Sequence, residues 1–566
     1  MKPLFYKLIA LNARYTHSCL ALFYVRSGLE ENIPGCQPEI MQCTINDPYY
    51  PTLRRLGADE PAALFFSVYI WSSSYIKRLI RDLVKLLPPE TPIILGGPQA
   101  GTLARELPPE VSRRCTVVYG EIEGIEKSFY HDLTGLKLQR KYSCGKIKEF
   151  RNPYRPDDFN GPLKNRHIYY ESSRGCPFGC TYCLSASEKG VRRLQPSQVF
   201  EEIKSILQGG PKVIRFVDRT FNDRPERALE IWQFLAEQPG DTLFHFEMAP
   251  DRFTEEIFQF LEQVGLGRFQ FEIGVQSTNQ ETLKAINREC DLAKLEQNIR
   301  KLVSLDTIHL HLDLILGLPY ENKESFARSL ADVFALGPHY IQMGLLKILP
   351  DTPISRCIEE FGLLVCESPP YEILANRWLD KIELEDLYWF GECVETFHNN
   401  RFFRSLWNYL STTGDDIFLF FNSLLTLCHE RGFFELAPTQ ELMSSLLLEV
   451  TQRRPDRELV RELLIYDWLR CGHHFLPVHF EQESIARQRK SIWKKIPQNW
   501  EGIYDYKSRD EFFKQGVFAE FSGEFLREVG MSDDDKTAYV CFQAARENTV
   551  FRLNTFVFIP GSILGG

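Results

Sequence analysis

The first 130 residues alternate short apolar runs with stretches of helical periodicity. The apolar runs predict strands at 3–12, 38–47, 62–71, 91–97 and 115–120, with helices at 18–31 and 75–87. Runs that are apolar throughout, separated by helices, are typical of parallel strands covered on both faces. The pattern therefore predicts an α/β fold that begins with a doubly wound, Rossmann-like sheet, and such sheets bind ligands beyond the carboxyl ends of their strands.

A second series of strands begins at residue 168. It has apolar runs near 168–172, 212–217, 243–247, 269–275, 308–316 and 340–348, with helical stretches between most of them. Six β/α units predict a complete or partial TIM-type barrel, whose chemistry lies at the C-terminal ends of the strands.

The remaining segments complete the predicted domain plan. Residues 136–167 are rich in Pro, Asn, Asp and charge and are predicted to be a linker, and long helical stretches dominate beyond residue 366. The predicted domains are a sheet domain at 1–135, a linker at 136–167, a barrel at 168–365 and a mainly helical C-terminal domain at 366–566.

Composition narrows the classes of function. The 566 residues include 66 basic and 76 acidic side chains, for a net charge of −10, which argues against nucleic acid as a partner on grounds of charge. The densest basic stretch, 487–495, is interpreted as a solvated helix face. The apolar run at 417–427 is too short to span a bilayer and predicts a buried helix. With no visible export signal, we expect a cytoplasmic protein.

Three of the fifteen cysteines cluster in "SSRGCPFGCTYCLS" at 172–185, as Cys176, Cys180 and Cys183. Thiolates suit zinc or iron–sulfur clusters, but a structural zinc site needs four ligands, and no nearby Cys or His pair completes the set. Cys144 lies too far back to belong to the same tight loop. Three cysteines could instead hold three irons of a [4Fe–4S] cluster and leave the fourth open to a substrate or cofactor. A zinc site or a chance grouping is the alternative.

With Tyr182 just before Cys183, this loop resembles the signature of radical S-adenosylmethionine (SAM) enzymes. The resemblance continues in "RFVDRTFN" at 215–222, although the usual Gly-Gly-Glu is absent there, in "FEIGVQS" at 271–277, and in "DLILGLPYE" at 313–321, where Asp313 replaces a leading glycine. It implies a SAM site made of Tyr182, Asp218, Thr220, Glu247, Glu272, Gln276, Ile315 and Gly317. Taken singly, each of these residues could also be a rim charge, a packing residue or part of a turn.

The sheet ahead of the barrel resembles the cobalamin-binding domain of the B12-dependent branch of this superfamily. No Gly-x-Gly-x-x-Gly follows the first strand, which disfavours a dinucleotide. The loop "NARYTHSC" at 12–19 lacks Asp-x-His-x-x-Gly, so His17 is expected to pack or cap rather than bind cobalt. The resemblance implies a cobalamin site made of Asn12, Tyr15, Thr16, Ser67, Tyr69, Trp71, Gly96, Gly97, Gly120 and Glu121.

The resemblance extends to an uncharacterised subgroup with an extra C-terminal domain, and it implies a cobalamin-dependent radical SAM enzyme. The expected reaction is methyl transfer to an unactivated carbon: one SAM methylates cobalamin, and another, cleaved at the cluster, gives a 5′-deoxyadenosyl radical. The alternatives are radical chemistry without methyl transfer, such as rearrangement, thiolation or RNA modification, and a cofactor-binding sensor or scaffold. Flavodoxin or ferredoxin is the expected type of electron donor.

The C-terminal segment "CGHHFLPVH" offers a second candidate metal site in Cys471, His473, His474 and His479. Adjacent histidines point to different sides of a helix and have no spaced partner pair, so structural or surface roles are the preferred interpretation. The C-terminal domain is expected to cover the barrel mouth or to help select the substrate.

Overall fold

The computed structural model describes residues 4–187, 190–480, 485–495, 509–533, 536–542 and 556–559. The chain divides into two compact units. Unit 1 comprises Met1–Glu272, Lys284–Cys290 and Leu346–Arg377, and unit 2 comprises Ile273–Leu283, Asp291–Leu345 and Trp378–Gly566.

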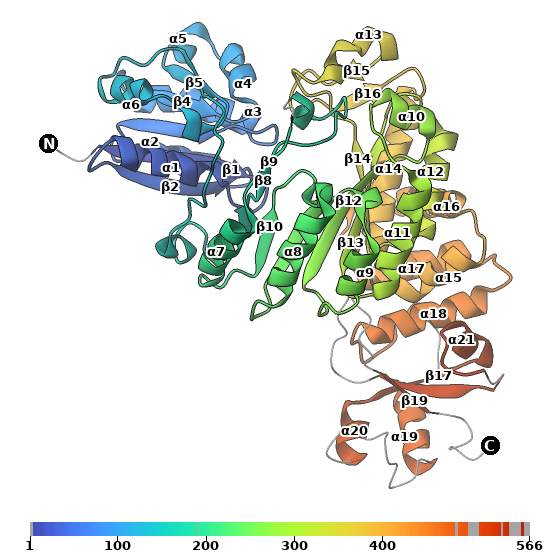
Figure 1. The fold of residues 1–566 in the computed structure, drawn as a ribbon. Coiled ribbons are helices and arrows are strands. Elements are labelled where there is room, and N and C mark those ends of the chain that lie inside the picture. The colour runs from blue at the N-terminus through green and yellow to red at the C-terminus, as the bar shows by residue number, and fades with distance from the viewer. Residues whose placement is uncertain are drawn as a thin grey trace. The chain divides into compact units, whose positions relative to one another are not determined.

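The first sheet lies entirely in unit 1 and confirms the predicted doubly wound fold (Figure 1). Its six strands run in the order β2-β1-β3-β4-β5-β6, and every neighbouring pair is parallel. The short sixth strand falls within the stretch predicted to be a linker. The strands are β1 Phe5–Asn12, β2 Gln37–Thr44, β3 Ala63–Ser67, β4 Ile93–Gly96, β5 Cys115–Tyr119 and β6 Lys141–Ser143.

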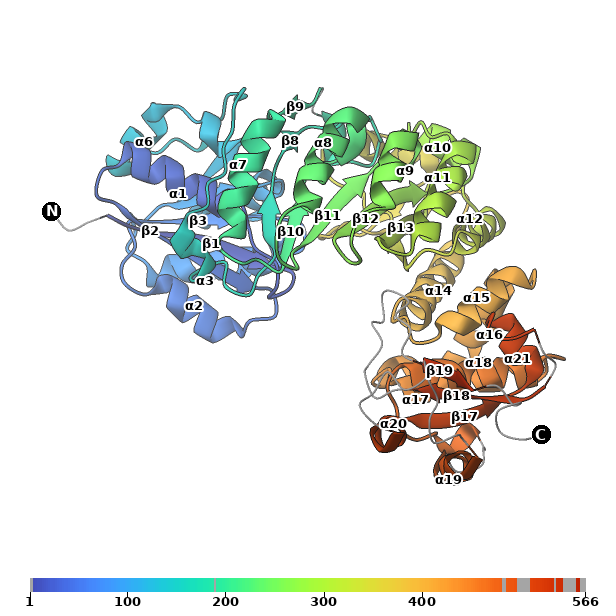
Figure 2. The same cartoon turned by 60° about the horizontal axis from the view of Figure 1, so that its bottom comes forward.

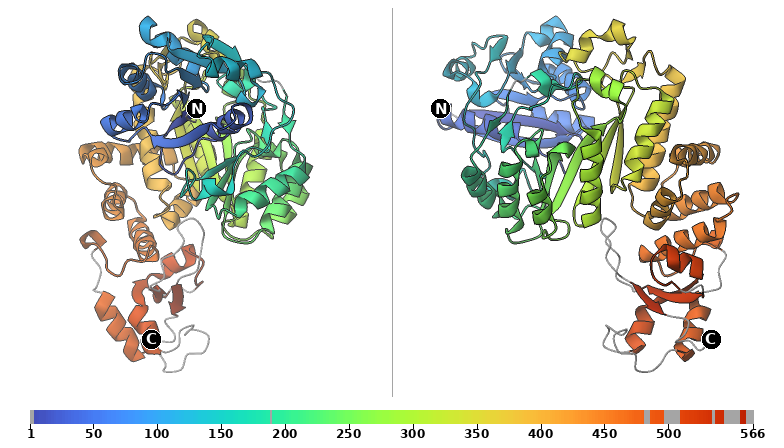
Figure 3. Two further views of the ribbon diagram at one scale, coloured as in Figure 1. Left: turned by 90° about the vertical axis from the view of Figure 1, so that its left-hand side faces the viewer. Right: turned by 45° about the vertical axis from the view of Figure 1, so that its right-hand side comes forward.

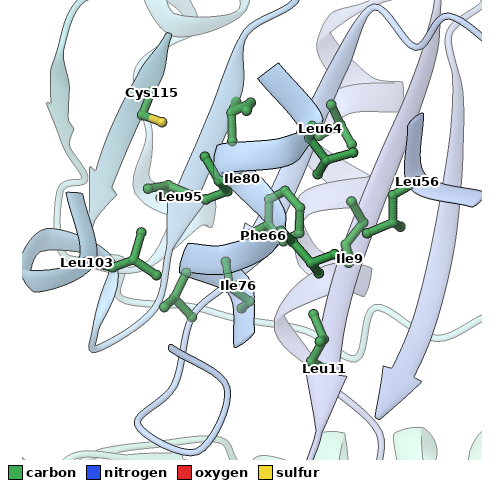
Figure 4. Packing of buried hydrophobic residues seen from close by; sticks show 14 of the residues in the cluster. Ile9, Leu11, Leu56, Leu64, Phe66, Ile76, Ile80, Leu95, Leu103 and Cys115 are labelled. Carbon is green, nitrogen blue, oxygen red and sulfur yellow. The ribbon is translucent and has the colours of Figure 1, made fainter. Parts of the chain in front are cut away.

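Helices bury both faces of the first sheet. Neighbouring residues Phe65 and Phe66 belong to opposite cores, because successive side chains of a strand point to opposite faces. Figure 4 shows the core around Phe66, where Ile76 and Ile80 of α3 meet Ile9 of β1. Helices α1 Ala21–Asn32 and α6 Lys127–Thr134 cover one face, and α2 Tyr49–Gly57, α3 Ser73–Leu86, α4 Ala100–Glu106 and α5 Pro109–Ser112 cover the other.

The second sheet has six strands that follow one another in chain order, which confirms the predicted partial (β/α)6 barrel. Neighbours β7/β10, β10/β11 and β13/β14 pair in parallel. The strands are β7 Ile168–Tyr170, β10 Val213–Phe216, β11 Leu243–Met248, β12 Phe269–Gln276, β13 His309–Leu316 and β14 Tyr340–Leu345.

In unit 1, the strands of the second sheet are apolar on one face only. Phe246 and Phe271 are fully buried and pack their rings against Trp232 of α8, with centroids 5.9 and 5.3 Å away. Helices α7 Pro196–Leu207, α8 Pro225–Ala236 and α9 Glu255–Leu261 accompany these strands (Figure 2). Residues that alternate with the apolar set form what we call the polar face: Tyr169, Arg215, His245, Glu247 and Glu272.

Unit 2 continues the same design in β13, whose four leucines at 310, 312, 314 and 316 are buried while the intervening residues are partly exposed. Helix α14, Lys381–His398, protects the backbone of β14. Met343 N donates to Glu395 Oε1 at 2.8 Å, and Asn399 bonds both N and O of Ile341 at 2.9 and 2.8 Å. Side chains of α14 thus satisfy backbone groups that an edge strand leaves unpaired.

The C-terminal part of unit 2 is mainly helical, as predicted, and includes a three-stranded antiparallel sheet, drawn in red in Figure 3. The run at 417–427 lies in the half-buried helix α16. No helix in the described ranges is long and apolar enough to cross a membrane. The elements are α15 Arg404–Thr412, α16 Ile417–Glu430, α17 Gln440–Thr451, α18 Arg457–Arg470, α19 Ile485–Lys495, α20 Arg509–Gln515, α21 Gly523–Glu528, β17 Val517–Phe521, β18 Ala538–Phe542 and β19 Phe556–Ile559.

The remaining α-helices and strands include both short and long elements. They are β8 Ser173–Arg174, β9 Arg192–Arg193, α10 Gln280–Ala285, α11 Leu292–Leu305, α12 Lys323–Ala335, α13 Ile358–Phe361, β15 Leu364–Val365 and β16 Ile373–Ala375.

Candidate active site

The three clustered cysteines lie on a loop, residues 175–191, that follows β7 and is closed by a two-residue ladder. Strands β8 and β9 pair Ser173 with Arg193 and Arg174 with Arg192. Gly175 has φ +96, and a Cβ atom there would lie 2.2 Å from the carbonyl oxygen of Gly190. Only glycine tolerates both that backbone conformation and that close approach. We call 175–191 the cysteine loop.

The middle of the cysteine loop is held by backbone hydrogen bonds from elsewhere in unit 1. Thr181 N donates to Ile286 O at 2.9 Å, and Ile354 N donates to Thr181 O at 3.0 Å. Asn287 Nδ2 donates to Gly179 O at 2.8 Å. The cysteines are therefore presented on a supported loop, which favours a preformed ligand set.

Cys180 and Cys183 lie close enough to Cys176 to affect its ionisation. Burial raises the pKa of Cys176, a contact with Thr220 lowers it, and charges on Cys183 and Cys180 raise it further. Arg288 Nη1 lies 3.6 Å from Cys180 Sγ and brings a positive charge to the trio. A guanidinium beside a thiolate offsets the negative charge that metal binding requires of the sulfur.

This donor set fits an iron–sulfur cluster. Within the described ranges, no three His, Cys, Asp or Glu side chains are grouped as ligands to a single metal ion. Cluster thiolates each bind their own iron, so they do not converge on one point as the ligands of a zinc ion do. Three soft thiols on one loop supply ligands for three irons.

Of two residues predicted to contact SAM, Asp218 binds the residues that lead into the cysteine loop, and Thr220 lies against the loop itself. Asp218 is fully buried and accepts hydrogen bonds from Ser172 N at 2.9 Å, Ser172 Oγ at 2.5 Å and Ser173 Oγ at 2.7 Å. Burial raises its pKa, which the bonds from these serines lower in part. Thr220 Oγ1 lies 3.7 Å from Cys176 Sγ. Asp218 thus anchors the start of the cysteine loop, and its contact with SAM stays a prediction.

Tyr182 shares its surroundings with Arg288 and Cys180. Burial raises the pKa of Tyr182 and the charge of Arg288 lowers it, with Cys180 and Cys183 acting in the opposite direction. Sequence reasoning missed Arg288, which lies 108 residues beyond Cys180 and belongs to no recognised motif. Nothing in the sequence singles it out, because its role depends on how the chain returns to the loop.

The polar face brings the predicted residues Glu247 and Glu272 to one side of the sheet. Glu272 Oε2 lies 2.9 Å from His245 Nε2 and 3.4 Å from Arg215 Nη2. The buried Nδ1 of His245 has no hydrogen-bond partner within the described part of the chain. Burial raises the pKa of Glu247 to about 7; the charge of Arg219 lowers it and that of Glu272 raises it. Glu247 can therefore carry or release a proton near neutral pH.

The SAM residues predicted in unit 2 lie at the ends of β12 and β13, with Ile315 and Gly317 at β13. Gln276 is buried and has φ +73, a strained conformation for a residue with a side chain. The ends of the two strands are joined by Glu321, a fully buried carboxyl group that accepts from Ser277 Oγ at 2.5 Å and Ser329 Oγ at 3.3 Å. Burial raises the pKa of Glu321 to about 7, and the two serines lower it.

At the carboxyl edge of the first sheet, Tyr69 and Trp71 form a stacked pair, with ring centroids 4.4 Å apart and planes 8° apart. Trp71 is 45% exposed, and its Nε1 donates to Leu11 O at 3.1 Å. A held, exposed aromatic surface suits a flat ligand. Asn12 and Ser67, in contrast, are buried, and Asn12 Nδ2 donates to Gln42 Oε1 at 2.9 Å.

Gly96 and Gly97 differ in what surrounds them. Space beside Gly96 is open to 4 Å, as the predicted close approach of a ligand requires. A Cβ atom on Gly97 would lie 2.7 Å from Val68 O, and its φ is +96. Contact with the chain's own backbone therefore already accounts for glycine at 97.

The loop after β1 is bonded to the strand that leads into the cysteine loop. His167 N donates to Thr16 O at 2.7 Å, and the Arg166 guanidinium lies 4.3 Å from the centre of the Tyr15 ring. His17 Nδ1 pairs with Tyr169 Oη at 2.6 Å. Burial lowers the pKa of His17, which favours the neutral ring.

Gly120 and Glu121 lie in the loop after β5, where the Glu121 carboxylate is already occupied. It forms ion pairs with Arg192 and Arg174. Burial raises the pKa of Glu121, but the two arginines outweigh it and hold the pKa below its usual value. Its predicted contact with cobalamin stays a prediction.

The C-terminal histidines bond to neighbouring polar side chains. His473 stacks on Trp468 at 3.8 Å, and its Nε2 lies 3.0 Å from Gln440 Oε1. His479 Nε2 lies 2.9 Å from Ser444 Oγ. These contacts support the structural interpretation of that segment.

Two segments of the chain match known protein families. Residues 170–333 match the radical SAM superfamily, and residues 359–542 match a family described as a protein of unknown function, DUF4080. The first match begins at β7 and includes the cysteine loop and the ends of β10 to β13.

Curated relatives match beyond the barrel. The chain is 24% identical to the cobalamin-dependent radical SAM methyltransferase TokK of Streptomyces tokunonensis over 54% of its own length and 50% of the relative. It is 24% identical to 2-(S-pantetheinyl)-carbapenam-3-carboxylate methyltransferase of Streptantibioticus cattleyicolor over 63% and 60%. The matches thus span half to three fifths of these relatives.

Solved structures share the fold. The cobalamin-dependent radical enzyme OxsB, with aqua-cobalamin and SAM bound, superposes with a TM-score of 0.58 at 15% identity, covering 83% of this chain and 79% of that one. The methyltransferase TsrM of Kitasatospora setae, with cobalamin and a [4Fe–4S] cluster, gives 0.51 at 16%, covering 65% and 78%.

Proposed function

We propose that this radical SAM enzyme binds cobalamin at the carboxyl edge of its first sheet and transfers a methyl group to an unactivated carbon. When bound, the cluster supplies the electron that cleaves SAM, and cobalamin carries the methyl group. Cys176, Cys180 and Cys183 would hold the cluster, with Arg288 balancing thiolate charge and Tyr182 lying beside it.

One observation carries the proposal: the loop after β1 is bonded directly to the strand that introduces the cysteine loop. Thr16 O accepts from His167 N, and His17 pairs with Tyr169 of β7. Residues predicted to contact cobalamin are thereby tied, within one compact unit, to the element that presents the cluster ligands. At the same edge, the exposed Trp71, which stacks on Tyr69, gives a corrin ring a surface to lie against. The likeness to TokK, TsrM and OxsB adds support.

The polar face would receive the substrate. A closed barrel fills its interior with Val, Ile and Leu, whereas these strands carry Arg215, His245, Glu247 and Glu272. Arg215, His245 and Glu272 bond to one another, but the buried Nδ1 of His245 has no partner among the described residues. A buried polar atom of this kind favours a polar ligand or water, because leaving it unpaired is costly. We propose that this face recognises the substrate. We also propose that a flavodoxin or ferredoxin is the electron donor and that the protein works in a reducing compartment.

The test is anaerobic reconstitution of the full chain with iron, sulfide and hydroxocobalamin, followed by incubation with SAM and a low-potential reductant. We expect cluster absorbance, cobalamin retained through gel filtration, and both 5′-deoxyadenosine and S-adenosylhomocysteine. Formation of 5′-deoxyadenosine alone would identify radical chemistry without methyl transfer. Absence of cluster absorbance would contradict the proposal altogether.

A further inference from the structure

Arg174 occupies the position immediately before the cysteine loop. It is the second residue of β8, pairs across the ladder with Arg192, and is separated from Cys176 only by Gly175. Because Arg174 directly precedes the cysteine loop, a displacement of its backbone would also displace Cys176, the first predicted cluster ligand.

The Arg174 side chain lies among three carboxylates. Its Nη2 lies 2.7 Å from Glu171 Oε2 and 2.6 Å from Glu123 Oε1, and its Nη1 lies 3.2 Å from Glu121 Oε2. The first two are hydrogen bonds, whereas the contact with Glu121 is an ion pair without hydrogen-bond geometry. Arg192 places a second guanidinium on Glu121.

The Arg174 side chain is also fixed in its orientation. Only 9% of it is exposed, and its guanidinium lies 4.5 Å from the centre of the Phe150 ring and 5.1 Å from that of Tyr24. Cation–π contacts of this kind hold the guanidinium plane. Removing one member of such a buried group leaves a charge without its counterion, so the two loops do not separate easily.

Two of the three carboxylates belong to the loop after β5, at the carboxyl edge of the first sheet. Glu121 and Glu123 lie in the stretch 120–124, where Gly120 and Glu121 are predicted to meet cobalamin. The far end of this stretch is pinned as well, since Gly145 N donates to Gly124 O at 2.9 Å. A ligand that fixes the conformation of residues 120–124 therefore also fixes the position of the Arg174 side chain.

We propose that Arg174 is a positioning residue that couples the two cofactor sites, so that cobalamin bound at the first sheet and the cluster bound by the cysteines each raise the other's affinity. This inference rests on the proposed function, because it requires cobalamin to bind near residues 120–123. Coupling between two sites is reciprocal: the factor by which the cluster raises cobalamin affinity equals the factor by which cobalamin raises cluster affinity.

The experiment measures hydroxocobalamin affinity, by absorbance titration or equilibrium dialysis, for the full chain with and without a reconstituted cluster. For the wild-type chain we expect the cluster to raise the affinity by about fivefold or more, the lower end of ordinary coupling factors. Arg174→Gln should bring this ratio to within about twofold of one. The ratio is the readout, because a general weakening of the first sheet would lower both affinities together and leave the ratio at its wild-type value.

Arg174→Lys tests the geometry of the contact. Lysine keeps the charge but cannot bond several carboxylates through a planar fork, so it should restore only part of the ratio. Glu123→Gln weakens the same ion network from the loop after β5. It should lower the ratio of cobalamin affinities with and without the cluster, and it remains a test if Arg174→Gln fails to fold. The matched control is Arg155→Gln, which removes an exposed ion pair with Glu30 in the same unit and should keep the wild-type ratio.

The outcomes separate the two proposals. If no form of the chain retains hydroxocobalamin, the proposed function fails and the inference fails with it. If cobalamin binds with the same affinity whether or not the cluster is present, the inference alone is wrong. A wild-type ratio that survives both Arg174→Gln and Glu123→Gln would also overturn it.

Discussion

The two parallel sheets of this chain have the same number of strands but differ in what their faces do. The first sheet is buried on both faces, so its chemistry is confined to the carboxyl edge, where Tyr69, Trp71 and Gly96 lie. The second is apolar on one face and carries arginine, histidine and glutamate on the other. A sheet with two covered faces can offer only its loops to a ligand. A sheet with one covered face can also use its strands, whose side chains are placed more precisely.

The largest expected effect concerns the cysteine loop, which follows the first strand of the second sheet. Cys183→Ala should remove a cluster ligand, so iron content should fall to background and SAM cleavage by at least about a thousandfold, since enzymes commonly supply a factor of ~10⁶ or more. The matched control is Cys115→Ala, a buried cysteine in the core of the first sheet, which should keep its iron. If both variants lose iron equally, the trio is not the ligand set. Iron analysis and anaerobic SAM assays decide.

The next effect contrasts a core residue with a polar-face residue. Phe66→Ala should lower the free energy of unfolding of the first sheet by about 3–5 kcal/mol, because a cavity replaces a buried ring. His245→Leu should lower the free energy of unfolding only slightly, because leucine has a similar volume and the change removes a buried Nδ1 that has no partner among the described residues. The same change should lower turnover. Hydrogen exchange and turnover assays measure the two quantities. Equal losses of stability would show that the polar face is a core after all.

The smallest expected effect is a change in pH dependence at Glu321. Its pKa rises from an ordinary 4.5 to about 7 in the folded chain, so the folded state binds more protons than the unfolded state between these values. Stability is therefore lost as pH rises from about 4.5 to 7, and the loss stays constant above that range.

Glu321→Gln should remove this dependence while keeping an oxygen to accept from Ser277 and Ser329. The melting temperature of the variant minus that of the wild type should increase by a few degrees as the pH is raised from 5 to 8. Glu324→Gln, an exposed change in the first turn of α12, is the control and should leave the difference flat. A constant difference for Glu321→Gln across pH would contradict the raised pKa.

Much of the fold was predictable because hydrophobic periodicity marks strands and helices locally. The predicted runs at 243–247 and 308–316 correspond to β11 and β13 almost residue for residue. Strand β6 was missed because three residues with one buried side chain carry no period, and only its neighbour β5 gives it a place in the sheet.

The candidate site was predictable only where it is contiguous in sequence. The cysteine trio and Tyr182 share one loop, so spacing alone identifies them. Arg288 comes from a distant segment that meets the cysteine loop only after folding, and Arg174 likewise meets Glu121 and Glu123 only after folding. Asp218 illustrates a different limit: its position at a strand end was correct, but its carboxylate bonds to Ser172 and Ser173. Residue type cannot reveal which partner a side chain has taken.

The polar face affects which residues of this protein can change as its sequence evolves. Under the proposed function, substitutions at His245 and Glu247 change what a substrate meets, while the aromatic rings packed on Trp232 at the other face stay in place. The cofactor loops have no such freedom, because Gly175, Asp218 and Arg174 each serve the backbone or the ion network around the cysteines. Under the proposed function, selection would alter substrate preference one strand residue at a time while the cysteine loop and its neighbours stay constant, and an engineer seeking new substrates should begin on that same face.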